Sequence, residues 1–252
     1  MSDSDSDTDD GPGQRTCIVP HLGLGDMIVL NGMVRAACRA SDEVLLFAKR
    51  AYVSSVRSLF GDLRNLRLKF VEEAHEFYAD DCALLRSAEA MGYRVVTLGD
   101  HTGSREWMAT DPAWTHALYR HAGLDPRLMY DRFHVVRNED REQAMLRTVR
   151  AAVGDVYVVV HDDPARDLVI NRDLLPTGMA VVHVDDPRWR TNNIVDYAAV
   201  IDNAMHLHAL DSCFMLMADF MDLRPRKFCH AYCREFSGTS YKSNVTVIRL
   251  RH

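Results

Sequence analysis

The sequence predicts an α/β protein with two Rossmann-like halves, and two observations indicate this fold class. Short apolar runs alternate with segments whose apolar residues recur at helical spacing, which is the pattern of parallel strands joined by helices. The alternation stops once, at an irregular stretch over residues 125–137, and then starts again. At 252 residues, 47% of them hydrophobic, the chain is long enough to bury a core without disulfides.

The first fourteen residues are predicted to form a disordered acidic tail. Ser or Thr alternates with Asp there, and the segment ends in Gly-Pro-Gly, so it offers too little apolar area to fold. The chain has a formal charge of −6, and five of its negative charges are aspartates of residues 1–14. The remainder is therefore close to neutral, which argues against a broad nucleic-acid surface but not against a local anion pocket.

The first Rossmann-like half is predicted over residues 15–125. Its strands are expected at residues 16–20, 43–48, 66–71 and 94–98. Its helices are expected at 27–37, 52–60, 80–91 and 112–123, and Gly61, Gly92 and Gly123 mark three of their ends. Strands separated by helices in this way pair in parallel.

A bridging segment is predicted over residues 126–154, with one helix at 139–153, before the second half at 155–252. Strands are expected there at residues 156–160, 179–184, 205–210, 227–233 and 245–250, and helices at 193–204 and 212–223. The strand at 156–160 has no polar interruption, which is typical of a parallel strand buried on both faces.

Several classes of protein are disfavoured by what the sequence lacks. No apolar stretch approaches the length of a membrane span and the N-terminus is acidic, so we expect a cytoplasmic protein without a membrane span. Cys229-His230-x-x-Cys233 has no second Cys/His pair, so no zinc site is expected. The Walker loop, the serine-nucleophile elbow and the third glycine of a dinucleotide fingerprint are missing, which disfavours a kinase, a serine hydrolase and an NAD oxidoreductase.

The first candidate site is the loop His-Leu-Gly-Leu-Gly-Asp at residues 21–26, between a strand and a helix. Gly23 and Gly25 would let a ligand approach the backbone, and the N–H groups at the helix start would suit an anion. Asp26 faces the crevice at the carboxyl end of the strand, or acts only as a helix cap.

The second candidate site is His-Asp-Asp-Pro-Ala-Arg at residues 161–166, after the buried strand. His161 and Arg166 could bind a phosphate, and the two aspartates could hold a divalent metal with a diphosphate. An equally good interpretation is a polar turn in which Arg166 pairs with a neighbouring aspartate.

Further candidates follow the next strand of the second half. Asp211 or Ser212 would cap an apolar helix whose first amides could cradle a diphosphate. His206 and His208 share a strand face, which makes a metal pair conceivable without an obvious third ligand. Asn193 opens the preceding helix and is most simply its cap.

Taken together, these segments resemble a glycosyltransferase of GT-B type. The loop at 21–26, followed by Asn31-Gly32, is similar to the start of small proteins from giant viruses, phage and metagenomes, and to the Gly-Asp opening of heptosyltransferases. The strand end at 157–166 resembles that of fucosyltransferase-like enzymes. The segments at 193–197 and 208–214 look like later motifs of the same small proteins, with Cys213 in place of a serine.

The resemblance implies two Rossmann-like domains facing across a cleft, with a nucleotide-sugar on the second and a carbohydrate or glycoprotein acceptor on the first. It implies Asp26 or His21 as the base. The donor would be bound by His161, Arg166, His208, Asp211 and Ser212, and the acceptor by Gly23, Gly25, Asn31 and Asn193. Such enzymes generally use neither a metal nor a resident cofactor. The alternative function is a catalytically inactive nucleotide- or sugar-binding module with the same fold.

Overall fold

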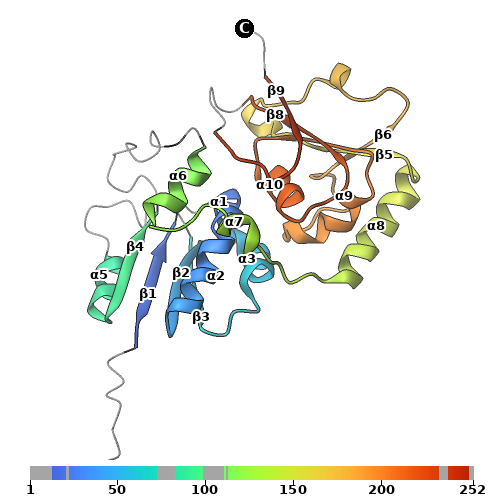
Figure 1. The fold of residues 1–252 in the computed structure, drawn as a ribbon. Helices are drawn as coiled ribbons and strands as arrows, with labels where there is room; N and C mark the ends of the chain where they lie inside the picture. The colour runs from blue at the N-terminus through green and yellow to red at the C-terminus, as the bar shows by residue number, and fades with distance from the viewer. Residues whose placement is uncertain are drawn as a thin grey trace, which may run out of the picture.

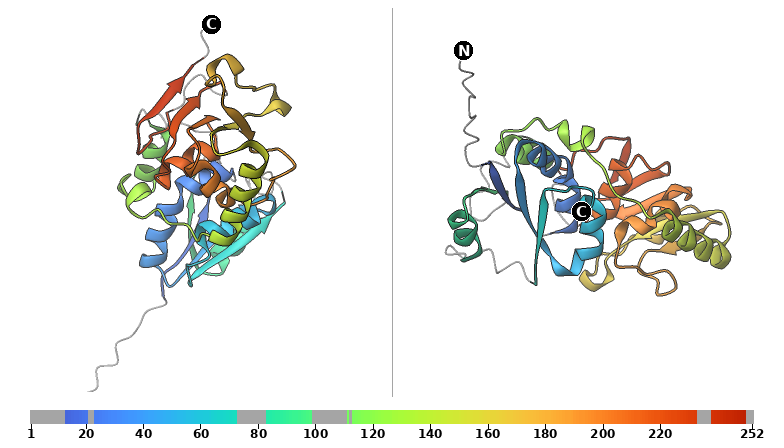
Figure 2. Two further views of the ribbon diagram at one scale, coloured as in Figure 1. Left: turned by 90° about the vertical axis from the view of Figure 1, so that its right-hand side faces the viewer. Right: turned by 90° about the horizontal axis from the view of Figure 1, so that it is seen from below.

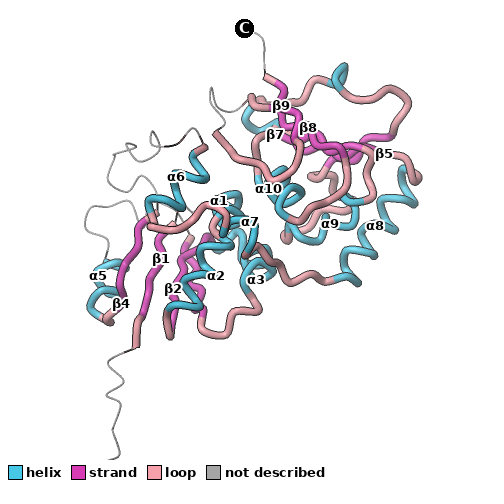
Figure 3. Tube along the Cα trace, in the orientation of Figure 1, coloured by secondary structure: helices cyan, strands magenta, loops and turns pink. Residues whose placement is uncertain are grey.

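A computed structural model describes residues 13–20, 23–72, 83–98, 111, 113–232 and 238–249. It is a mixed α/β protein with two parallel sheets (Figure 1). The tube drawing shows the strands in two separate groups with helices between them (Figure 3). The predicted tail lies outside the described residues, apart from Gly13 and Gln14.

The first sheet has the strand order β3-β2-β1-β4 and is parallel throughout. Its strands are β1 (Arg15–Val19), β2 (Glu43–Lys49), β3 (Leu66–Val71) and β4 (Tyr93–Thr97). Four of the five residues of β1 and five of the seven of β2 are buried, because these central strands are covered on both faces. The four strands predicted for this part of the chain and their parallel pairing are confirmed.

The helices of the first half agree with the apolar periodicity, with one break. The helix expected at 27–37 is divided at Leu30 into α1 (Leu24–Val29) and α2 (Asn31–Ala40). A short 3-10 turn, η1 (Arg50–Tyr52), leads into α3 (Val53–Phe60), which ends at Gly61 as expected. Then follow α5 (Ala83–Ala90), α6 (Trp114–His121) and, inside the stretch expected to be irregular, the short α7 (Leu128–Asp131).

Gly32 explains how closely α2 and α7 pack. A Cβ atom at this position would overlap the backbone carbonyl of Leu128. Only glycine fits such a contact without a backbone shift. Helix α6 is also attached to this region. The phenol of Tyr119 in α6 donates to the Val29 carbonyl of α1 at 2.8 Å and accepts from the Met33 amide of α2 at 3.0 Å.

The second sheet has the order β6-β5-β7-β8-β9, also parallel throughout. Its strands are β5 (Tyr157–His161), β6 (Ala180–His183), β7 (His206–Leu210), β8 (Arg226–His230) and β9 (Val245–Ile248). Its helical segments are α8 (Glu139–Val153), η3 (Pro164–Arg166), η4 (Arg172–Leu174), η5 (Ile194–Tyr197), α9 (Ala198–Asp202) and α10 (Cys213–Phe220).

The two halves share one continuous hydrophobic core. A single cluster of buried residues runs from β1 and α1 into β5, α9 and α10. Helices α1 and α10 lie between the two sheets in Figure 1 and in the turned views of Figure 2, and they contact each other. Phe220 of α10 packs edge-on against Tyr130 and Phe133 with ring centroids 5.1 and 5.3 Å apart.

The chain also crosses back from the second half to the first. Trp114 of α6 donates to the hydroxyl of Thr239 at 3.1 Å, and Tyr130 donates to the Ser240 carbonyl at 3.0 Å. Helix α8, expected in the bridging segment, packs on β6 and α9 of the second half. None of the described helices combines the length and the apolar character that crossing a bilayer requires.

Candidate functional site

A pocket of about 520 Å³ lies between the two halves. Its residues follow the carboxyl ends of strands: Leu24 comes after β1, Tyr52 after β2, and His161 ends β5. Open parallel sheets bind ligands at this edge. The first half contributes Leu24, Ala51, Tyr52 and Ser55, and the second contributes His161, Asp162, Val184, Asp185, Arg190, Thr191, Asn192, Ile194, Tyr197 and Phe214.

The glycine loop places Asp26 in the first turn of α1, two residues after Leu24, which lines this pocket. Gly23 is the N-cap residue of α1, and a Cβ atom there would lie 2.5 Å from Oδ2 of Asp26, so the carboxylate folds back over the helix start. An acid in the first turn is stabilised by the helix dipole. Asp26 is also close enough to Tyr52 to help raise the pKa of that phenol, after burial and Cys213. His21, the other predicted base, lies outside the described residues.

Gly25 marks the closest approach of α1 to α10. A Cβ atom on Gly25 would lie 3.4 Å from Cδ1 of Leu216 and 3.8 Å from the backbone nitrogen of Cys213. The loop after β1 and the start of α10 are therefore held beside each other. Two segments that the sequence singled out separately come together here.

His161 and Ser212 form a hydrogen-bonded pair on the second-half side. Ser212 Oγ lies 3.0 Å from His161 Nδ1, and the His161 ring packs against Phe214 with centroids 4.5 Å apart. Burial lowers the pKa of His161 to about 4, so the imidazole is neutral at pH 7. Ser212 is the N-cap residue of α10 but makes no side-chain capping bond, because its hydroxyl turns to His161. The first amides of α10 therefore receive no capping bond from the Ser212 side chain.

The structure pairs Arg166 with a neighbouring aspartate. Its Nε donates to Oδ2 of Asp163 at 2.6 Å, and the guanidinium holds the pKa of that carboxyl below its usual range. This is the polar turn that the sequence left open as an alternative. Arg166 is not among the residues that line the pocket.

The arginine that does line the pocket is Arg190, which the sequence analysis did not select. Within the described residues its side chain makes no hydrogen bond or ion pair. The nearby Arg188 is engaged instead, since it pairs with Asp186 at 2.6 Å and its guanidinium carbon lies 4.3 Å from the centre of the Trp189 ring. The sequence shows two arginines two residues apart, and nothing in the pattern distinguishes the paired one from the unpaired one.

Asp162 adds negative charge to the pocket. Its carboxylate lies 3.4 Å from Arg172 and 3.8 Å from Nδ1 of His183. Asp163 is held by Arg166, so the two aspartates do not act as a pair. Among the residues that the structure describes, no group of three His, Cys, Asp or Glu side chains could hold a metal ion.

Asn31 and Asn193 lie in structural positions. Asn31 is fully buried, and its amide donates to the carbonyls of Leu59 and His134, each at 2.9 Å, while its oxygen accepts from Arg35 and from the His134 amide. Asn193 caps η5 through the Val195 amide and donates to Ser58 Oγ at 3.0 Å. Both amides connect segments that are distant in sequence, and we leave them out of the proposed site.

His208 lies on the other face of the second sheet. Side chains alternate along a strand, and β7 sends Leu207 and Ala209 to the α10 side, while His208 packs on Phe228 at 4.5 Å between ring centroids. Its Nδ1 lies 3.2 Å from Nε2 of His230. The structure therefore does not bring His208 together with His161.

Asp211 sits beside the start of α10, but its carboxylate is engaged. The hydroxyls of Thr239 and Tyr241 donate to Oδ1 of Asp211 at 3.3 and 3.2 Å. Burial and this carboxylate raise the pKa of Tyr241 strongly, so its phenol remains protonated. Asp211 thus fixes the returning C-terminal segment against α10.

Comparison with solved structures relates this arrangement to a known fold. The chain superimposes on the crystal structure of a glycosyl transferase family 9 protein from Veillonella parvula, with a TM-score of 0.58 and 10% identity over 95% of this chain and 88% of the other. The fold is shared. The iron-containing dodecameric glycosyltransferase TibC from enterotoxigenic E. coli also matches, with a TM-score of 0.47 and 10% identity over 86% and 58% of the two chains. No family model and no curated protein matches this chain.

Proposed function

We propose that this chain is a glycosyltransferase that moves a sugar from a nucleotide-sugar to a hydroxyl group of a carbohydrate or glycoprotein acceptor. The observation that carries the proposal is the pocket that His161 and Arg190 line together with Tyr52 of the first half. Ser212 is hydrogen-bonded to His161, and Asp26 is close enough to Tyr52 to act on its pKa. The fold shared with a glycosyl transferase family 9 protein supports it. In this proposal the two Rossmann-like halves are domains that face each other across a cleft.

The second half would bind the donor phosphates. The amides at the start of α10, which Ser212 does not cap, and the helix dipole favour an anion there. When His161 accepts the Ser212 proton at Nδ1, its Nε2 carries a proton that it can donate to a phosphate oxygen. Arg190 supplies a full positive charge and two parallel N–H groups for the same oxygens.

The first half would bind and activate the acceptor. The acceptor hydroxyl lies against the α1 loop, where residues 23–26 are partly exposed, and gives its proton to Asp26. Its oxygen bonds to the anomeric carbon while the bond from that carbon to the donor phosphate breaks. The nucleoside phosphate leaves with the electron pair, and Arg190, His161 and the α10 amides stabilise its charge.

A panel of UDP-, GDP-, ADP- and CMP-sugars tests the donor. A true donor binds only the folded chain and raises its melting temperature by mass action, and we expect one nucleotide class to do so without added metal and with EDTA present. Release of the matching nucleotide in the presence of saccharide acceptors then shows transfer. Binding without release on any acceptor would indicate the inactive binding module, and a panel with no binder would overturn the proposal.

A further inference from the structure

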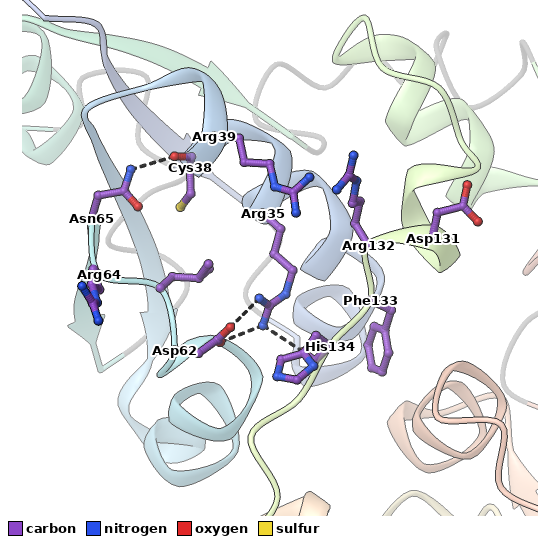
Figure 4. Close-up of a pocket in the computed structure, with 11 residues that line it drawn as sticks. Arg35, Cys38, Arg39, Asp62, Arg64, Asn65, Asp131, Arg132, Phe133 and His134 are labelled. Atoms are coloured by element: carbon purple, nitrogen blue, oxygen red, sulfur yellow. Dashed lines mark hydrogen bonds and ion pairs between the residues drawn. The ribbon is translucent and has the colours of Figure 1, made fainter.

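A second pocket, of about 550 Å³, lies on the first half (Figure 4). Its walls are the C-terminal end of α2, the turn at residues 62–65 and the segment at residues 131–134 that leaves α7. These walls precede β2 and β3, so the pocket is at the amino edge of the first sheet. The inter-half pocket is at the carboxyl edge, and the seven residues of β2 separate the two edges by about 20 Å.

Polar side chains tie the three walls together, and two of them, Asn31 and Arg35, are buried. Arg35 pairs with both carboxylate oxygens of Asp62, at 2.7 and 2.8 Å, and donates to the His134 carbonyl at 3.0 Å. Asn31 donates to that same carbonyl. Asn65 donates to the carbonyls of Cys38 and Ser41 at 2.7 and 2.8 Å. The pocket is therefore held in shape before any ligand arrives.

The pocket rim carries arginines that this network does not use. Arg39, Arg64 and Arg132 are exposed, and within the described part of the chain none of their side chains makes a hydrogen bond or an ion pair. Arg39 is not needed to satisfy the end of α2, because Asn65 already does so. Figure 4 shows the guanidinium groups of Arg39 and Arg132 pointing toward one another.

The acidic residues do not cancel this charge. Four arginines and two aspartates line the pocket, a formal net charge of +2, although the folded part of the chain as a whole is close to neutral. Asp62 is taken by Arg35, and Asp131 points away from the arginines in Figure 4. Like charges held around a concave surface focus their field and attract an anion.

We propose that this pocket binds the phosphate group of a small phosphorylated molecule, with Arg39 and Arg132 as its main ligands and Arg64 at the rim. Two guanidinium groups that point toward one another repel each other. A phosphate between them can accept paired hydrogen bonds from both and neutralise their charge. The site is separate from the inter-half pocket and does not depend on transferase activity.

Arginine footprinting on the full chain tests the site residue by residue. Phenylglyoxal modification is followed by mass spectrometry with and without inorganic phosphate, pyrophosphate or ribose 5-phosphate, and with sulfate at equal ionic strength. We expect at least one phosphate probe to slow modification of Arg39 and Arg132, while Arg147, exposed on α8, reacts unchanged. Protection by all three indicates a general phosphate site, and protection by pyrophosphate alone indicates a diphosphate site. Equal slowing at Arg147 or by sulfate, or no slowing, would overturn the proposal.

Calorimetric titration with pyrophosphate gives an independent measure. It uses protein carrying Arg190→Gln in every sample, so that any binding at the inter-half pocket is weakened and is the same in the variants compared. Adding Arg39→Gln and Arg132→Gln should weaken binding about tenfold or more, the loss expected for charge-assisted contacts. Adding Arg147→Gln instead should leave binding unchanged. Because all three side chains are exposed, each variant should keep the parent's melting temperature, and equal affinity in the two variants would contradict the proposal.

Discussion

Asp26 is the residue on which the proposed transfer step depends most. Its carboxylate lies over the N-cap residue of α1, and its charge helps to raise the pKa of Tyr52 in the pocket wall. Replacing Asp26 with Asn keeps the shape of the side chain and removes the proton acceptor. We therefore expect Asp26→Asn to lower kcat by about a hundredfold or more with little change in stability.

The exposed Asp173→Asn, on η4, is the matched control and should retain full turnover. Circular dichroism and the melting temperature show whether each variant is folded. Wild-type turnover in the Asp26 variant would remove this residue from the chemistry.

We expect replacement of Arg190 and replacement of Arg166 to have different effects on binding of the donor phosphate. Arg190 lines the pocket with no partner among the described residues, whereas Arg166 is held by Asp163. We expect Arg190→Gln to raise the Kd of the nucleotide-sugar about tenfold or more and Arg166→Gln to change it little. Calorimetry on the two variants decides between them, and the reverse result would restore the role that the sequence suggested for Arg166.

The sequence predicted which segments contribute to the site better than it predicted the contacts that each side chain makes. The glycine loop and the start of α10 could be found because strand ends followed by Gly, Asp or Ser have a local signature. The partner of an arginine depends on long-range placement, as Arg190 and Arg166 show. The same is true of Asn31, whose amide meets Leu59 and His134 far along the chain.

At the scale of elements, β7 and β8 place two neutral histidines side by side. Burial lowers the pKa of His208 to about 4, with help from His230 and His206, and burial alone lowers that of His230 to about 4. The unfolded chain takes up these protons near pH 6.5, but the folded chain does so only near pH 4. The free energy of unfolding should therefore fall as the pH drops from 6.5 toward 4.

His208→Gln removes one of these titrating groups. The pH dependence of stability between pH 6 and 4.5 should become shallower by up to about 1.4 kcal/mol per pH unit, which corresponds to one proton. Urea unfolding at several pH values measures this slope. The exposed His134→Gln serves as the control, and a wild-type slope in the His208 variant would contradict the assignment.

Elements with a strong period were predicted well, and short or divided ones were not. Helix α8 matches the expected bounds at both ends, because its fifteen residues keep one apolar face. The four residues of α7 are too few to show a period. The sequence of β7 does not show which face of the sheet His208 is on. Either the face with His206 and His208 or the face with Leu207 could be the one that α10 covers, and only the structure decides.

At the scale of the whole molecule, the shared core predicts one unfolding unit. Buried residues of both sheets belong to one cluster, and Ser55 of α3 accepts from the Ile194 amide across the interface at 3.0 Å. We expect far-ultraviolet circular dichroism and tryptophan fluorescence to report the same urea midpoint. Calorimetry should give equal van't Hoff and measured enthalpies, and two resolved transitions would show that the halves unfold separately.

The position of Phe220 between Tyr130 and Phe133 has a practical consequence for protein engineering. A chimaera that joined the second sheet to a foreign partner at residue 154 would keep Phe220 but lose both rings that cover it. The transplanted piece would then expose an aromatic surface and tend to aggregate. The junction of such a chimaera should lie before Tyr130, so that Tyr130 and Phe133 are transferred together with α10, the helix they cover.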